Sequence, residues 1–222
     1  MEPIFEAVLA DDVGAIAALL DASPAALGTV RDADELVQQI PHWLYRGDTP
    51  LHLAAAGLRL GALNVLLNRG ASVDPVNRRG AAPLHYACDP RPFSVGVWSP
   101  ATQLEVIERL IKAGAAVDRA DRGGVTPLHR AVRARSVSAV QALLAGGANP
   151  LARTKDRGST PLHMVVTSTG AGGTADTSAQ QIEIARALLS AGASLDDVDG
   201  AGAAVTDRLR TGPLGDALTL VR

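Results

Sequence analysis

Aromatic residues and cysteine are scarce in this chain of 222 residues. Phe, Trp and Tyr together make up 3% of it, although 47% of the residues are hydrophobic. A core must therefore be built from small and medium aliphatic side chains, which favours repeated thin contacts between helices over one deep core. Cys88 is the single cysteine, which excludes an internal disulfide and a cysteine-based zinc site and fits a reducing cytoplasm.

Long apolar runs and a strong charge of one sign are also missing. No stretch reaches the roughly 18 apolar residues that a membrane span needs, and the first residues lack the positive charges that open a signal peptide. The formal net charge of −2 gives no global reason to expect a nucleic-acid partner. We therefore expect a folded protein that stays in the cytoplasm, is complete as given and has no membrane partner.

One short motif recurs four times. It reads Thr49-Pro50-Leu51-His52, Ala82-Pro83-Leu84-His85, Thr126-Pro127-Leu128-His129 and Thr160-Pro161-Leu162-His163, preceded by Gly47, Gly80, Gly124 and Gly158. Successive histidines of the motif lie 33, 44 and 34 residues apart, and a Gly-Ala pair follows each unit at 70–71, 114–115, 147–148 and 192–193. The period is therefore 33 or 34, with about 11 residues inserted twice.

The motif has the chemistry of a helix start. Thr caps the N-terminus of a helix through its hydroxyl, and Pro fits the first helical position, where an amide hydrogen has no partner. A second apolar stretch follows in each unit, at 60–67, 104–111, 137–144 and 182–189, with helical spacing such as Leu104, Ile107, Leu110 and Ile111. Glycine then ends that helix. Each unit is predicted to be helix, turn, helix and loop.

The Gly-x-Thr-Pro-Leu-His-x-Ala motif with its downstream Leu-Leu-x-x-Gly-Ala resembles the ankyrin repeat, over about residues 44 to 195. The resemblance implies an all-α solenoid of helix-turn-helix units joined by β-hairpin-like fingers, whose first helices line a concave face. We expect a single domain, 1–222. Its parts are an N-terminal cap (1–22), a long connecting finger (23–46), repeats at 47–80, 80–124, 124–158 and 158–200, and a C-terminal cap (201–222).

Three segments depart from the repeat. Residues 23–46 include a predicted short helix at 34–40; residues 89–100 form an insert, and residues 169–179 form a second insert typical of a flexible loop. Four of the six aromatic residues fall in the first two departures: Trp43, Tyr45, Phe93 and Trp98. Two interpretations stay open, namely anchors for a partner or rings that fold back over the chain's own apolar surface.

Charge is distributed unevenly along the chain. Residues 119–157 carry eight basic against two acidic residues, whereas residues 1–48 carry nine acidic against two basic ones. By resemblance, partner contacts belong to finger tips and exposed positions of the first helices. These map to Tyr45, Arg46, Asp48, Arg78, Arg79, Asp89, Arg122, Val125, Arg133, Asp156, Arg157 and Ser159. An acidic protein segment would complement the basic middle; the alternative is an ordinary solvated surface.

Catalytic and metal-binding patterns are weak. The four motif histidines recur one repeat apart, so we expect each to bond polar groups near a finger rather than to share a metal. His42 lies outside this register and has no assigned role. Cys88 occupies the small-residue position of Ala55, which predicts packing rather than nucleophilic chemistry with His85. Residues 170–174 lack the lysine of a phosphate-binding loop.

The sequence therefore predicts a non-enzymatic protein-interaction module without cofactor or metal. The partner would be another protein, bound through the concave face, the fingers and the aromatic departures. Two alternatives stay open: nucleic-acid binding through the arginine-rich middle, which we consider less well supported because aromatics are not interleaved with it, and a small-molecule site beneath the 89–100 insert.

Overall fold

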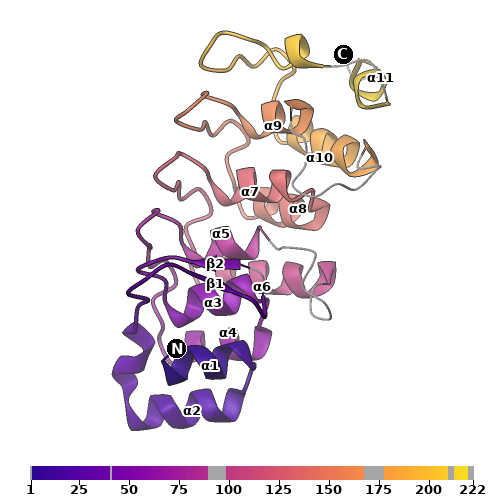
Figure 1. Ribbon diagram of the computed structural model, residues 1–222. Helices are drawn as coiled ribbons and strands as arrows, with labels where there is room; N and C mark the ends of the chain where they lie inside the picture. Colours follow the sequence, from indigo (N-terminus) through magenta and orange to yellow (C-terminus); the bar gives the residue numbers. More distant parts are fainter. Residues whose placement is uncertain (1, 41, 90–98, 168–177, 210–212, 220–222) are drawn as a thin grey trace. The chain divides into compact units, whose positions relative to one another are not determined.

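The computed structural model describes residues 2–40, 42–89, 99–167, 178–209 and 213–219 (Figure 1). The centres of both predicted inserts, at 90–98 and 168–177, lie outside the described residues. The chain forms two compact units, Met1–Ala116 and Val117–Arg222. The single domain expected from the sequence stays a prediction.

The first unit is built from paired helices. These are α1 (Pro3–Leu9), α2 (Val13–Ala22), α3 (Pro50–Ala56), α4 (Leu60–Asn68), α5 (Pro83–Ala87) and α6 (Pro100–Lys112), with a 3-10 turn η1 (Pro24–Gly28). Helix α3 packs against α1 and α5, and α4 packs against α2 and α6, so successive first and second helices form two layers. The N-terminal helix pair predicted from the sequence is present as α1 and α2.

Residues 34–40 do not form the short helix that we predicted. Instead β1 (Glu35–Val37) pairs antiparallel with β2 (His42–Leu44), with Leu36 opposite Trp43. Val37 and Leu44 are buried while Leu36 and Trp43 are exposed, the alternation that a strand imposes. The apolar spacing of Leu36, Val37 and Ile40 suggested a helix, but contacts with distant residues favour the hairpin.

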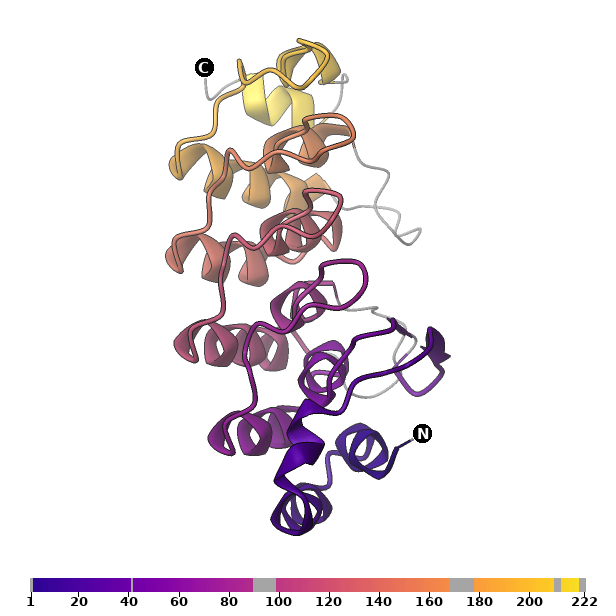
Figure 2. The same cartoon turned by 90° about the vertical axis from the view of Figure 1, so that its left-hand side faces the viewer.

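The second unit repeats the same plan. It contains α7 (Pro127–Arg133), α8 (Val137–Ala145), α9 (Pro161–Thr167), α10 (Ser178–Ser190), a 3-10 turn η2 (Thr206–Arg208) and α11 (Pro213–Thr219). Helix α7 packs on α9, α8 on α10, and α10 on α11, as the stacked layers of Figure 2 show. The closing helix pair predicted at 204–210 and 214–221 is thus a 3-10 turn followed by one short helix.

Small side chains explain how the helices approach so closely. Ala54, Ala55, Ala62, Ala87 and Ala131 are fully buried, and the aliphatic side chains of each second helix fill the remaining core. Cys88 is also fully buried, at the position of Ala55 in the preceding repeat, as predicted. Each motif proline is the first residue of its helix, so α3, α5, α7 and α9 begin where the sequence places them.

Candidate protein-interaction surface

Five tight turns project between the helix pairs, and we call them fingers: residues 45–48, 77–80, 121–124, 154–158 and 199–202. A glycine with positive φ lies in each, at 47, 80, 124, 158 and 202. In the last four fingers that glycine is the final residue, and its amide donates back to the carbonyl of the first. Glycine adopts this left-handed conformation without the clash that a Cβ would cause.

Three fingers are held by an Asn or Asp that the sequence analysis did not single out. Oδ1 of Asp121 accepts the amides of Gly123 and Val125 at 2.8 and 3.0 Å. Asn77 and Asp199 accept from the equivalent amides of their own fingers. The signal was present in the sequence, because each of these residues lies three positions before the finger glycine.

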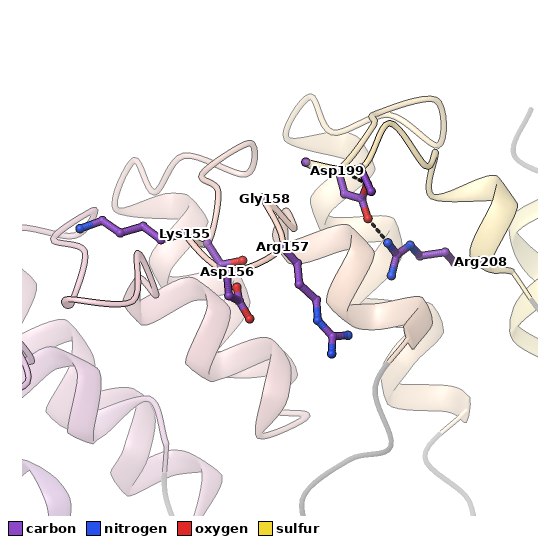
Figure 3. Close-up of a pocket in the computed structure, with 9 residues that line it drawn as sticks. Lys155, Asp156, Arg157, Gly158, Asp199 and Arg208 are labelled. Atoms are coloured by element: carbon purple, nitrogen blue, oxygen red, sulfur yellow. Dashed lines mark hydrogen bonds and ion pairs between the residues drawn. The ribbon is translucent and has the colours of Figure 1, made fainter.

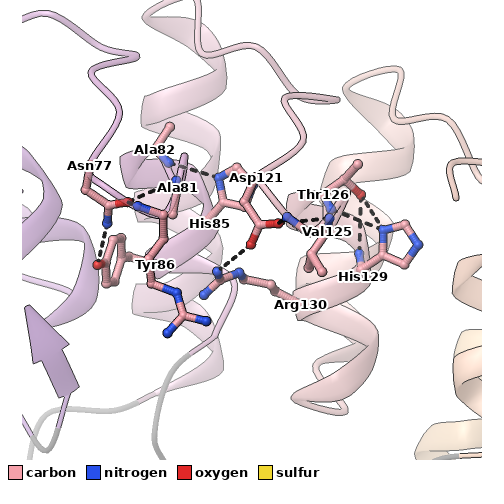
Figure 4. A network of polar contacts seen from close by, with 12 residues as sticks. Asn77, Ala81, Ala82, His85, Tyr86, Asp121, Val125, Thr126, His129 and Arg130 are labelled. Atoms are coloured by element: carbon pink, nitrogen blue, oxygen red, sulfur yellow. Dashed lines mark hydrogen bonds and ion pairs between the residues drawn. The ribbon is translucent and has the colours of Figure 1, made fainter. Parts of the chain in front are cut away.

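The side chains of these three residues also bond to the side chain of the residue nine positions later. Asn77 Nδ2 donates to the Tyr86 hydroxyl at 2.9 Å, and Arg130 donates to Asp121 at 3.1 Å (Figure 4). Asp199 forms the equivalent ion pair with Arg208. The finger at 154–158 begins with Thr154, whose hydroxyl accepts the Ser159 amide at 3.2 Å instead of bonding to a side chain of the following helix.

Neighbouring fingers are joined by main-chain hydrogen bonds. In the second unit the amide of Lys155 donates to the Gly123 carbonyl, and the amide of Gly200 donates to the Arg157 carbonyl, both at 2.8 Å. In the first unit, the amide of Arg78 donates to the Arg46 carbonyl at 2.9 Å. This spacing leaves no room for side chains, since a Cβ on Gly158 would lie 2.7 Å from the Gly200 nitrogen.

Three of the motif histidines, His52, His129 and His163, tie their first helices to the residue that follows the next finger. The amide of Thr126 donates to Nδ1 of His129 at 3.2 Å (Figure 4). The opposite nitrogen, Nε2, lies 3.3 Å from the Ser159 carbonyl. Because Nδ1 must accept, the proton belongs on Nε2 and the ring is neutral. Burial lowers the pKa values of His129, His52 and His163 in agreement with this role. The predicted structural use of these histidines is confirmed.

Asp48, which we predicted to contact a partner, is instead fully buried. It accepts hydrogen bonds from Asn77 Nδ2 at 2.8 Å and from the Tyr86 hydroxyl at 2.7 Å. His42 is buried beside the same network, with its ring 4.5 Å from that of Tyr86. Ser159 is buried as well. A site for a partner cannot use Asp48 or Ser159 directly.

The exposed charges of the first unit are largely paired. Arg78 forms an ion pair with Asp34, and Arg79 lies 4.8 Å from the Tyr45 ring centre and donates to its hydroxyl. The Arg78 guanidinium holds the pKa of Asp34 below its usual range. The acidic excess expected for residues 1–48 is therefore partly neutralised by arginines of its own unit.

Three exposed cations of the second unit lie on neighbouring fingers without ion pairs. Arg122, Lys155 and Arg157 are exposed on two joined fingers, and none forms an ion pair with a described residue. Arg130 and Arg208 are occupied by Asp121 and Asp199. The candidate surface is therefore narrower than the sequence suggested, and we call Arg122, Lys155 and Arg157 the basic finger cluster.

The other predicted contact residues vary in accessibility. Arg46 and Asp156 are exposed, whereas Tyr45, Asp89, Val125 and Arg133 are half-buried. The Thr154 hydroxyl and the Arg157 amide lower the pKa of Asp156 by hydrogen bonding. Trp43 is 45% exposed beside Leu36 at 38%, so part of its ring does not fold back. Phe93 and Trp98 lie outside the described residues.

A groove of ≈ 620 Å³ lies between the last two fingers. Lys155, Asp156 and Arg157 line one side, Asp199 and Ala201 the other, and Arg208 reaches it from η2. Figure 3 shows the Arg208 side chain turned toward Asp199 and Arg157, while Lys155 extends in the opposite direction. Arg157 and Arg208 are the basic side chains on this side of the two fingers, and Asp156 and Asp199 are the acidic ones.

Metal binding, cysteine chemistry and membrane insertion are not indicated in the described part of the chain. Within the described ranges, no three His, Cys, Asp or Glu side chains are grouped as metal ligands. Cys88 is buried, whereas a reactive cysteine needs access and a stabilised thiolate. No helix in the described part of the chain is long and apolar enough to cross a membrane.

Comparison with known families agrees with the repeat geometry. A family described as ankyrin repeats in three copies matches residues 98–199, and a single ankyrin repeat matches residues 46–78. No curated protein matches the chain. Ankyrin repeats are generally protein-protein interaction modules, and the predicted helical repeat solenoid is confirmed. The chain belongs to the ankyrin repeat family.

Proposed function

We propose that the protein is a non-enzymatic adaptor, scaffold or inhibitor that binds an acidic segment of another protein through the basic finger cluster. The grouping of Arg122, Lys155 and Arg157, which have no ion pair among the described residues, on two joined fingers carries this proposal. Cations without an ion pair favour an incoming anion, because no existing ion pair must be broken when it binds. The fingers are joined by main-chain bonds, so the cluster is held in place before binding.

The alternative of nucleic-acid binding is less well supported by the same surface. Residues 99–222 contain no Phe, Trp or Tyr, so the second unit has no aromatic ring on which a base could stack. The cluster also contains only three cations, few for a surface that neutralises many phosphates. The small-molecule alternative concerned the 89–100 insert, most of which lies outside the described residues.

A charge-reversed variant tests the proposal. Partners are captured from native lysate on the intact chain, identified, purified and measured for binding to the Arg122→Glu/Lys155→Glu variant. The control is Arg109→Glu/Lys112→Glu, which makes the same change in charge at exposed positions of the first unit that have no ion pair among the described residues. We expect the first variant alone to lose the partner. Equal binding by both variants would exclude the basic finger cluster, and binding of duplex DNA at low salt would favour the nucleic-acid alternative.

A further inference from the structure

The groove between the last two fingers is a preformed feature of the second unit. Its walls are the finger at 154–158 and the finger at 199–202, fastened by the bond from the Gly200 amide to the Arg157 carbonyl. Arg153 reinforces the junction, because its guanidinium donates to the carbonyls of Gly158 and Val198 at 3.0 and 2.5 Å. A volume of ≈ 620 Å³ is in the range of sites that hold a short segment of a ligand.

The two carboxylates in this groove are already used within the chain. Asp199 pairs with Arg208 through Oδ2 and accepts the amides of Ala201 and Ala203 through Oδ1, at 2.9 and 3.0 Å. Asp156 accepts from the Thr154 hydroxyl and the Arg157 amide, which lowers its pKa. The Arg157 guanidinium is exposed and has no ion pair among the described residues. Arg157 is therefore the cation of this groove that has no ion pair, because Arg208 pairs with Asp199 and the Lys155 side chain extends away.

We infer that this groove receives one carboxylate side chain, an Asp or Glu of an extended partner segment, with Arg157 as its main contact. The inference rests on the proposed function and adds the position of the acidic residue. One carboxylate is enough to pair with Arg157, whereas a phosphate dianion would bring a second negative charge beside Asp156 and Asp199. Arg157 offers several donors to the carboxylate, and Asp199 acts as a positioning residue by holding Arg208 in the wall.

Backbone amide NMR of the labelled full chain tests where an acidic ligand binds. The probe is a peptide of about ten residues that alternates Glu and Ser, long enough when extended to cross several fingers. The control is the same peptide with Gln in place of Glu. We expect the Glu peptide to shift the amides of residues 156–158 and 200–201, and the Gln peptide to leave them unchanged. Displacement of the Glu peptide by an equal concentration of inorganic phosphate would overturn the preference for a carboxylate.

Three variants make the inference specific. Arg157→Gln removes the proposed contact, and Ala201→Phe fills the groove without a change in charge. Arg186→Gln removes the same charge from an exposed position of α10. Loss of a charged hydrogen-bonded contact predicts roughly tenfold or greater weakening for Arg157→Gln, similar weakening for Ala201→Phe, and no more than about a twofold change for Arg186→Gln.

The possible failures are distinguishable. If the Glu peptide shifts only residues 121–124 and Arg157→Gln binds normally, the groove is wrong and the proposed function stands. If about 1 mM Glu peptide shifts no amide signal of the second unit, both the groove contact and the proposed function are wrong. Amide spectra of the free variants confirm that each is folded before the comparison is made.

Discussion

The Gly200 amide donates to the Arg157 carbonyl at 2.8 Å, and Gly158, next to Arg157, faces the same Gly200 backbone. A Cβ on Gly158 would lie 2.7 Å from the Gly200 nitrogen, and φ at Gly158 is +60°. This close approach of two main chains fixes the width of the groove. Gly158 is therefore required by its contact with Gly200 as well as by the positive φ of its turn.

We expect Gly158→Ala to separate these fingers. The backbone conformation costs about 1–2 kcal/mol for any residue with a Cβ, and the contact with Gly200 adds to it, for a total of about 3 kcal/mol. Gly192→Ala is the control, because φ there is also positive but nothing lies within 4 Å of its Cβ. Urea unfolding of both variants checks the difference, and equal losses of stability would show that the finger contact contributes nothing.

The buried network around Asp48 should be sensitive to one hydroxyl. Tyr86→Phe removes the donor to Asp48 and the acceptor from Asn77, and leaves both of those groups buried. We expect a loss of about 1–3 kcal/mol in the free energy of unfolding. Tyr45→Phe removes a hydroxyl that contacts only exposed Arg79 in the described structure, so a change below about 0.5 kcal/mol is expected. An unchanged free energy of unfolding in Tyr86→Phe would contradict this network.

The second repeat lacks a cap that the third one has. The Thr126 hydroxyl accepts the His129 amide at 3.5 Å and lies 2.9 Å from His129 Nδ1, whereas the equivalent residue of the second repeat is Ala82, which has no side-chain oxygen. Thr126→Ala should destabilise by about 1 kcal/mol, and Ala82→Thr should stabilise by up to a similar amount. Thermal unfolding measures both. A loss of stability in Thr126→Ala together with a gain in Ala82→Thr would support the capping role. A loss of stability in both variants would show that Ala82 is required for packing.

Stability should fall as the pH drops from 7 toward 5. Burial lowers the pKa values of His52 and His129, so both stay neutral when folded, while the unfolded chain takes up protons below about pH 6.5. Each histidine then contributes a slope of up to about 1.4 kcal/mol per pH unit, and the stability it provides is complete above that pH. Urea unfolding between pH 8 and 5 checks the trend. A flat profile between pH 7 and 5 would show that these rings accept protons in place.

Much of the fold could be predicted because its signals are local. Thr126 and Pro127 start α7 by capping chemistry within one turn, and Ile107 and Leu110 lie on the buried side of α6 as their spacing predicts, although Leu104 is only half-buried. The same recurring motif predicted the structural role of His129. Local chemistry of this kind leaves little freedom for tertiary contacts to override.

The errors arose where distant residues decide the structure. The segment at 34–40 becomes a hairpin because Asp34 pairs with Arg78 and the His42 ring packs on Tyr86, both far along the chain. Asp48 is buried because Asn77 and Tyr86 satisfy its oxygens. Which basic residues lack a partner also depends on tertiary pairing, so the sequence indicated a basic region but not its three unpaired members.

The most direct test of the proposed function is site-specific photo-crosslinking to the partner. A photoreactive residue replaces Ala120, exposed at the base of the finger at 121–124, or Gln141, exposed on α8 of the same unit. The account predicts that position 120 crosslinks and position 141 does not, and that the crosslinked peptide contains several Asp or Glu residues. Crosslinking from position 141 alone, or to a peptide without acidic residues, would contradict it.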